Sequence, residues 1–241
     1  MTPVVTLNRV TKRYGDLVAL DDVTLAFPRG RFVAVMGPSG SGKSTLLQCA
    51  AALDRPTSGT VVMGGTDVGG LSETSRTELR RKHAGFVFQS YNLLPALSVQ
   101  DNITLPLRLA GVRPDLEWLG ELVHRVGLRE RLHHKPAELS GGQQQRAAIV
   151  RALAARPDVV FADEPTGALD LHSAGQVLDL LRELVDELGQ TVVMVTHDPV
   201  AATRAHDTLV MADGKVIDVL AAPTSEELAV RLTRLAGEPV T

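Results

Sequence analysis

The segment Gly37–Thr45, GPSGSGKST, places a glycine-rich loop between an apolar run, RFVAVM, and a helical pattern, TLLQCAAAL. Its spacing matches G-x-x-x-x-G-K-[ST], a loop whose backbone N–H groups surround phosphate. In this motif the lysine reaches the β- and γ-phosphates of a nucleotide, and the following hydroxyl ligates magnesium. The segment therefore predicts an α/β fold that binds phosphate where a strand ends and a helix begins. The residues expected to bind the nucleotide are Gly37, Pro38, Ser39, Gly40, Ser41, Gly42, Lys43, Ser44 and Thr45.

Three further apolar runs have the length of buried strands, and helical patterns separate them: GFVFQ, DVVFADE and TVVMVTH. Together with RFVAVM they predict a parallel sheet. Ligands of such sheets lie beyond the carboxyl ends of the strands. The residues at those ends, Gln89, Asp163 with Glu164, and His197, are therefore expected in one site with the phosphate loop.

The rest of the chain predicts one domain over residues 1–241, with an antiparallel layer and a helical insertion. Residues 1–90 and 155–241 are expected to form the parallel-sheet core and the β layer. Residues 91–154 are expected to form a mostly helical subdomain, in which PDLEWLGELVHRVGLRERL is helix and Pro106, Pro114 and Pro136 interrupt it. The segment DTLVMADGKVIDVL predicts a hairpin through Asp-Gly, and SEELAVRLTRLAG predicts an amphipathic helix.

Composition limits the classes of partner. The formal net charge of the 241 residues is -3, which gives no overall basic surface for nucleic acid. A single cysteine, Cys49, excludes an intrachain disulfide, and no basic stretch followed by an apolar run opens the sequence. We therefore expect a cytoplasmic protein. Because no apolar run reaches about 18 residues, we expect any membrane association to come through a partner. The run RRKH at 80–83 is expected to be a solvated face.

Asp163 and Glu164 are adjacent at a strand end, so their side chains point to opposite sides and suit two roles. One carboxylate suits the magnesium shell, and the other suits polarising or deprotonating water in line with the γ-phosphate. The alternative is that both acids only favour the start of the next helix. Gln89 and His197, taken singly, are also compatible with structural roles. Tyr14 suits stacking on adenine, or is an ordinary aromatic of a turn.

The segment LSGGQQQRAAIVRAL, from Leu139 to Leu153, starts an amphipathic helix with two glycines, which disfavour helix. Ser140 is expected at the N-cap, and Gly141 and Gly142 allow the backbone to approach an anion closely. The sequence therefore indicates a second place that binds phosphate. The alternative is a helix that begins with glycine and binds nothing.

Taken in order, these motifs resemble those of the nucleotide-binding subunits of ATP-binding-cassette (ABC) transporters over nearly the whole chain. The resemblance is carried by Tyr14, GPSGSGKST, Gln89, LSGGQQQR, VVFADE, ALD at 168–170 and His197. Within that family, GFVFQSYNLLPALSVQDNITLPL and DEPTGALD are most like the macrolide-exporter and lipoprotein-releasing group. Ala168 departs from the asparagine that is common there.

The resemblance implies an ATPase with ATP and Mg²⁺, which works as a head-to-tail dimer beside an integral membrane permease. Ser140, Gly141, Gly142 and Gln143 would then contact the ATP that a second subunit holds. It further implies that Glu164 is the base, that His197 contacts the γ-phosphate, and that Lys43 binds phosphate. The remaining roles are metal binding by Ser44, Asp163 and Gln89, with Gln89 also joining the metal site to the helical insertion.

A membrane partner is expected on the segment QSYNLLPALSV, which follows Gln89 directly. Its apolar residues either fill the core of the insertion or form a patch for the permease, and we expect Tyr91 and Leu94 to stay partly exposed. Two other functions remain open at this point. A small-molecule kinase explains the phosphate loop but not LSGGQ, and a DNA-repair or translation ATPase of the same superfamily keeps every motif.

Overall fold

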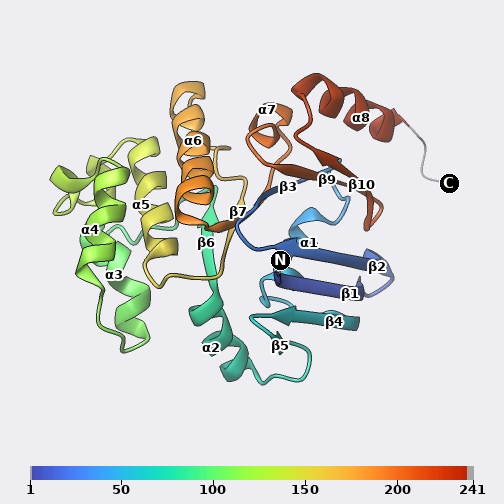
Figure 1. The fold of residues 1–241 in the computed structure, drawn as a ribbon, viewed down its shortest axis with the longest axis horizontal. Coiled ribbons are helices and arrows are strands. Elements are labelled where there is room, and N and C mark those ends of the chain that lie inside the picture. Colours follow the sequence, from blue (N-terminus) through green and yellow to red (C-terminus); the bar gives the residue numbers. More distant parts are fainter. Residues whose placement is uncertain (1, 238–241) are drawn as a thin grey trace.

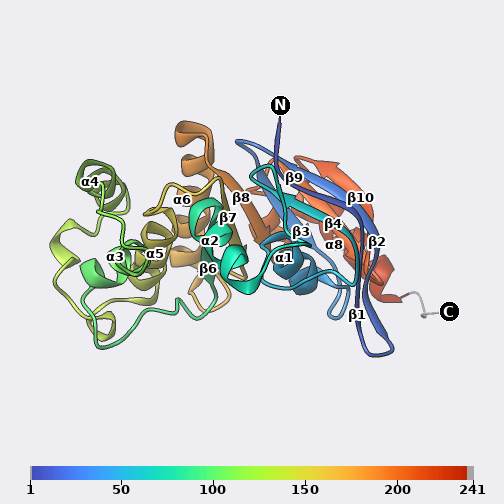
Figure 2. The same ribbon diagram turned by 90° about the horizontal axis from the view of Figure 1, so that it is seen from below.

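The computed structural model describes residues 2–237, which form two sheets and a group of helices to one side (Figures 1 and 2). The larger sheet has six strands. In spatial order they are β10 (Lys215–Ala221), β9 (Asp207–Ala212), β3 (Phe32–Met36), β8 (Thr191–Val195), β7 (Val159–Asp163) and β6 (Ala84–Phe88).

The four apolar runs form parallel strands, as the sequence predicts: β3 pairs with β8, β8 with β7, and β7 with β6. Strand β9 extends the parallel part on the other side of β3, and β10 returns antiparallel to it. The turn between β9 and β10 holds Asp213 and Gly214 at φ 47° and 74°, which is the left-handed geometry of a tight hairpin. Both the parallel sheet and the hairpin are thus confirmed.

The smaller sheet is the predicted antiparallel layer. Its strands, in spatial order, are β2 (Leu17–Pro28), β1 (Pro3–Tyr14), β4 (Ser58–Met63) and β5 (Thr66–Asp67). Strand β3 contributes to both hydrophobic cores because alternate side chains point to opposite faces. Val33 and Val35 pack in the cluster that contains the antiparallel layer, and Ala34 and Met36 pack in the cluster that contains the helices.

The helices α3 to α5 lie together on the side of the molecule away from the antiparallel sheet (Figure 1). The helical elements are α1 (Lys43–Ala50), α2 (Glu73–His83), α3 (Val99–Leu109), α4 (Leu116–Arg125), the short 3-10 helices η1 (Arg129–Arg131) and η2 (Pro136–Glu138), α5 (Gly141–Leu153), α6 (Leu171–Leu188), α7 (Pro199–Ala202) and α8 (Ser225–Gly237). Within residues 2–237, no helix is both long and apolar enough to pass through a bilayer.

Two details of the expected helical insertion are wrong. Pro106 does not interrupt the chain but lies inside α3, near its C-terminal end, and its carbonyl still accepts from Ala110 N at 3.1 Å. The helix expected up to Leu132 ends at Arg125, because Gly127 adopts φ 66° and turns the chain. Tertiary packing tolerates the proline, whereas the glycine stops the helix earlier than the apolar pattern suggests.

Candidate functional site

The phosphate loop connects β3 to α1, as the motif requires. Gly42 stands at the N-cap of α1 with φ 97°, and a Cβ atom there would lie 2.3 Å from the backbone oxygen of Ala19. Only glycine fits this position, because it supplies the left-handed backbone and leaves room for β2. The loop therefore leads directly into the first turn of a helix, where unpaired N–H groups favour an anion.

Lys43, the first residue of α1, turns back over the loop. Its Nζ donates hydrogen bonds to Gly37 O at 2.9 Å and Pro38 O at 2.8 Å. Burial lowers the pKa of Lys43, and the carboxylates of Glu164 and Asp163 oppose this shift. The ammonium group is thus held over the loop with two carboxylates nearby.

Asp163 ends β7, and Glu164 follows it in the left-handed region at φ 48°. Such a backbone is unfavourable for residues other than glycine, and both neighbouring acids line the same cavity. Burial and the nearby Glu164 raise the pKa of Asp163, while Lys43 opposes the shift. A cation placed beside Asp163 would therefore stabilise its charged form.

His197 lies just after β8 and meets Glu164. Its Nδ1 is 2.8 Å from Glu164 Oε1. An ionised carboxylate only accepts hydrogen bonds, so Nδ1–H is the donor and Nε2 is left for another contact. The backbone supports this pair, since Glu164 N donates to Val195 O at 2.9 Å.

Tyr14, at the end of β1, borders the same site and is 45% exposed. Its hydroxyl donates to Asp54 Oδ2 at 2.6 Å, and Lys12 Nζ lies 4.8 Å from the ring centroid. Burial and the bond to Asp54 raise the pKa of Tyr14 to about 12. The ring is fixed at its hydroxyl end and has exposed surface for stacking.

One cavity of about 640 Å³ brings most of the predicted residues together. The predicted residues that line it are Tyr14, Gly37, Ser39, Gly40, Gly42, Lys43, Ser44, Thr45, Asp163, Glu164 and His197. Pro38 and Ser41 belong to the loop but do not line the cavity, and Ser41 is buried beneath it. Residues from segments far apart in sequence therefore line a single cavity at the carboxyl ends of the strands.

Gln89 does not line this cavity. It follows β6, whose last residue, Phe88, pairs with Asp163 on β7, so it begins at the expected edge of the sheet. Its side chain packs on Gly167: a Cβ atom there would lie 2.7 Å from Gln89 Nε2. The structure thus places Gln89 beside the segment after Glu164 rather than among the cavity residues.

Ser140 caps α5 as expected. Its Oγ accepts from Gln143 N at 3.3 Å, and Gln143 Oε1 accepts from Ser140 N at 2.9 Å, which completes a capping box. The glycines also have packing reasons within the chain. A Cβ atom on Gly141 would lie 2.7 Å from Tyr91 Oη, and one on Gly142 would lie 3.1 Å from Ser173. None of these residues lines the cavity of the phosphate loop.

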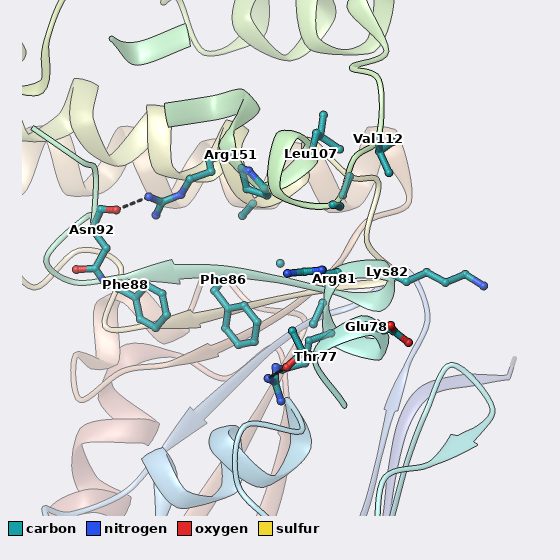
Figure 3. A pocket seen from close by; sticks show the side chains of 17 residues that line it. Thr77, Glu78, Arg81, Lys82, Phe86, Phe88, Asn92, Leu107, Val112 and Arg151 are labelled. Atoms are coloured by element: carbon teal, nitrogen blue, oxygen red, sulfur yellow. Dashed lines mark hydrogen bonds between the residues drawn. The ribbon is translucent and has the colours of Figure 1, made fainter. Parts of the chain in front are cut away.

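A second cavity, of about 720 Å³, lies where β6 meets helices α2, α3 and α5 (Figure 3). Phe86, Phe88, Leu107 and Val112 give it apolar walls. Its basic lining residues, Arg80, Arg81, Lys82 and Arg151, outnumber its one acidic residue, Glu78. We call this cavity the β6 groove. Its apolar walls and its basic residues suit an apolar ligand that carries negative charge.

The run at 80–83 is only partly the solvated face expected from sequence. Arg81 and Lys82 are exposed and line the groove. Arg80, however, donates from Nη1 to Ala52 O at 2.6 Å, and His83 pairs with Asp158. The run of basic residues in the sequence does not show that Arg80 and His83 turn inward.

Sequence reasoning missed two polar residues of α5. Gln145 is fully buried, and its Nε2 donates to Phe88 O at 3.2 Å and Pro165 O at 2.5 Å. Arg151 donates from Nη2 to Tyr91 O at 2.8 Å. A polar residue on the apolar face of an amphipathic helix is a signal for such contacts, and Gln145 gave that signal.

Comparison with known proteins connects the site to one family. The family model described as ABC transporter matches residues 20–167. The lipoprotein-releasing system ATP-binding protein LolD 1 of Rhodospirillum rubrum is 45% identical over 217 residues, which cover 88% of this chain and 96% of that protein. The macrolide export ATP-binding/permease protein MacB of Hyphomonas neptunium is 45% identical over 221 residues, covering 89% of this chain. The chain spans 34% of the length of that MacB protein.

A solved structure agrees with the sequence matches. The dimeric post-hydrolysis state of the ATP-binding cassette MJ0796, bound to ADP and Pi, superposes with a TM-score of 0.80 at 40% identity. The match covers 91% of this chain and 99% of that one. The fold therefore agrees with that of an ATP-binding cassette.

Proposed function

The chain belongs to the ABC transporter family, and from that premise we propose that it is the ATP-hydrolysing subunit of a membrane transporter. The observation that carries the proposal is the 640 Å³ cavity, because it joins the phosphate loop to the Glu164–His197 pair. The named relatives favour transport over the small-molecule kinase and over the DNA-repair or translation ATPase.

In the proposed reaction, the loop and Lys43 bind the β- and γ-phosphates of ATP. Glu164 accepts a proton from a water molecule as the water oxygen bonds to the γ-phosphorus. The bond between that phosphorus and the β-γ bridging oxygen breaks, which gives ADP and phosphate. His197 orients Glu164 through Nδ1, and its Nε2, when it carries a proton, would donate to the γ-phosphate. Lys43 stabilises the charge that develops on the phosphate oxygens.

The residues of the cavity also fit Mg²⁺. Ser44 and Asp163 supply hard oxygen donors in the same cavity, and burial beside Glu164 makes a cation favourable at Asp163. Among residues 2–237, no cluster of three His, Cys, Asp or Glu side chains is arranged to hold a metal alone. This suits an ion held partly by phosphate and water. When bound, it would neutralise phosphate charge. Gln89 is a further proposed ligand, and its side chain would have to turn away from Gly167 to reach the ion.

We propose that Ser140, Gly141, Gly142 and Gln143 contact the ATP of a second copy of the chain. They lie outside the chain's own phosphate cavity, and Ser140 is exposed at the N-terminus of α5, where phosphate is favoured. Leu171, which starts α6, is 95% exposed, as expected for an apolar residue that meets another chain. The dimeric MJ0796 structures support the dimer that this arrangement requires.

The β6 groove is the proposed docking surface for the permease. It lies next to the segment after Gln89, which connects it to the phosphate site. Its aromatic floor and its basic rim, formed by the exposed Arg81 and Lys82, fit a short apolar segment with at least one acidic residue. Through that permease the ATPase would lie on the inner face of the cell membrane.

The structure modifies the docking surface expected from sequence. Leu94 is 48% exposed and Tyr91 is half-buried, so both keep the partial exposure expected of them. Leu93 packs against the helical core, and Tyr91 Oη donates to Ala168 O. Of the segment Tyr91–Leu97, only Asn92 lines the groove. We therefore centre the proposed surface on the groove, with Leu94 outside it.

The test is ATP hydrolysis by the purified chain and by two variants. Lys43→Ala should abolish hydrolysis, because the phosphate charge loses its partner. Glu164→Gln should keep ATP binding, slow hydrolysis by about 100-fold or more, and accumulate an ATP-bound dimer. Size-exclusion chromatography with light scattering measures the dimer. Near wild-type turnover by Lys43→Ala would contradict the proposal, and so would an ATP-bound Glu164→Gln chain that stays monomeric.

A further inference from the structure

Arg151 holds the backbone of Tyr91 and Asn92 from across 60 residues of sequence. Its Nη2 donates to Tyr91 O at 2.8 Å, and its Nη1 donates to Asn92 O (Figure 3). Burial is the cause that lowers the pKa of Arg151, without an opposing carboxylate. The guanidinium group is thus committed to two carbonyl groups.

These two carbonyl groups belong to an unusual turn. Tyr91 and Asn92 adopt φ 59° and 51°, two consecutive left-handed residues that are not glycine. Such backbone is unfavourable and persists only where its surroundings hold it. The turn begins two residues after Gln89. Charge-assisted hydrogen bonds from Arg151 therefore stabilise the chain next to Gln89, the proposed metal ligand.

The other end of Tyr91 lies between the N-terminus of α5, which is proposed to act on a second copy, and the loop before α6. Its Oη donates to Ala168 O at 3.3 Å. A Cβ atom on Gly141 would lie 2.7 Å from Tyr91 Oη and 3.2 Å from Leu169 Cδ2. The tyrosine therefore touches the first residue of α5 and the loop that leads to α6.

Gln145 adds two more connections among the same segments. Its Nε2 joins Phe88 O, at the end of β6, to Pro165 O, directly after Glu164. With Tyr91 and Arg151 it ties α5, the end of β6 and the loop 165–170 into one unit. Phe88, Asn92 and Arg151 also line the β6 groove, so the same unit forms one wall of the proposed docking surface.

We propose that Tyr91, held by Arg151, is a positioning residue of the ATPase reaction: it fixes the N-terminus of α5 against the loop at Ala168. It thereby sets where Ser140 and this loop meet the nucleotide of a second copy. This role rests on the proposed function. In the proposed reaction Tyr91 touches no reacting atom, and it acts through Gly141 and Ala168.

The test compares small changes at both ends of the contact in the purified chain. Tyr91→Phe removes only the hydroxyl, Arg151→Met removes the guanidinium, and Arg151→Lys keeps a charge. Arg156→Met is the matched control, because Arg156 is an exposed arginine whose partner is Asp115. We measure kcat and KM for ATP, ADP affinity and thermal stability for each variant.

Tyr91→Phe should lower kcat by about threefold to tenfold, the effect of losing one hydrogen bond. ADP affinity should change by less than about twofold, since that measurement needs only the phosphate cavity. Arg151→Met should lower kcat at least as much, Arg151→Lys should recover part of the loss, and Arg156→Met should leave kcat unchanged. In a Glu164→Gln background, Tyr91→Phe should raise the protein concentration needed for the ATP-bound dimer by a similar factor.

Wild-type kcat and wild-type dimerisation in Tyr91→Phe would overturn the positioning role and leave the proposed function intact. A loss of ADP affinity as large as the loss of kcat would also overturn it, because the residue would then act on the fold of the whole site. Hydrolysis by the wild-type chain that does not depend on Lys43 would contradict the proposed function itself, and the positioning role with it.

Discussion

His197 Nδ1 lies 2.8 Å from Glu164 Oε1, although 33 residues separate the two in sequence. Glu164 is held at φ 48° by its place after β7, and His197 is exposed at the end of β8. The parallel pairing of β7 with β8 therefore creates the contact. The histidine fixes the orientation of a carboxylate whose backbone is already constrained.

We predict that His197→Ala lowers kcat by about tenfold to 1,000-fold, because Glu164 loses the group that orients it and the γ-phosphate loses a contact. ADP affinity should stay within about threefold of wild type. Steady-state ATPase assays and calorimetric titration with ADP measure the two effects. A variant that loses ADP binding in proportion to kcat would assign His197 to nucleotide binding instead.

Tyr14 provides a prediction for the adenine end of the cavity. Lys12 lies over one face of the ring and Asp54 fixes the hydroxyl, so a base would stack on the remaining surface. Tyr14→Ala should weaken ADP binding by about fivefold to 100-fold, the range for loss of one stacked aromatic ring. Tyr14→Phe keeps the ring and should bind within about threefold of wild type. Equal ADP affinities of Tyr14→Ala and wild type would exclude stacking.

The fold and the nucleotide cavity were predictable because their signals are local. The strand, glycine loop and helix around Gly42 are consecutive in sequence, and the backbone of that glycine is dictated by its neighbours. The N-cap at Ser140 depends on residues within one turn. Parallel strands then bring Asp163 and His197 to the same edge by a general rule of α/β folds.

The groove and the contacts of Arg151 were not predictable in this way. Arg151 reaches Tyr91 across 60 residues, and no sequence period marks an arginine that donates to carbonyl groups. Gln89 followed the strand-end rule, yet its side chain turned toward Gly167. Such outcomes depend on how side chains fill space after the elements have packed, which a pattern along the chain does not encode.

The surroundings of His206 predict that the stability of the fold depends on pH. Its Nδ1 accepts from Phe32 N at 3.0 Å, and its Nε2 lies 3.2 Å from Asp186 Oδ1. Burial, with Arg182 and Arg31 nearby, lowers the pKa of His206 from 6.5, while Asp186 and Asp207 oppose the shift. The neutral ring is therefore the form that fits the fold.

The direction in which stability changes with pH follows from this lowered pKa of His206. Well above pH 6.5 neither the folded nor the unfolded chain protonates this residue, so its contribution to stability is fully present. Below that pH the unfolded chain binds the proton first, and the free energy of unfolding falls by up to about 1.4 kcal/mol per pH unit until the pKa of the folded state is reached.

Asparagine at position 206 tests this, because its side-chain oxygen keeps an acceptor near Phe32 N and does not titrate. Urea unfolding of wild type and His206→Asn between pH 5 and 8, spanning the ordinary histidine pKa of about 6.5, should give a difference in stability that grows in favour of the variant as pH falls. A difference that is independent of pH would show that the ring does not titrate on unfolding.

Substitutions at Val112 and Leu94 distinguish two docking surfaces for the permease, the β6 groove and the segment after Gln89. Val112 lines the groove and is 53% exposed, and Leu94 is exposed to a similar degree but lies outside it. An aspartate at position 112 would place negative charge against the acidic segment that the basic rim favours.

Val112→Asp should therefore reduce co-purification of the permease by about tenfold and remove stimulation of the ATPase by that permease, with ADP affinity and thermal stability near wild type. Leu94→Asp is the matched control, since it adds the same charge to an exposed apolar position and should reduce co-purification less. The permease is recognised by mass spectrometry of detergent-solubilised membranes as a protein with several membrane-spanning segments. If Leu94→Asp were the more damaging of the two, docking would centre on the segment after Gln89 and the groove would be only its neighbour.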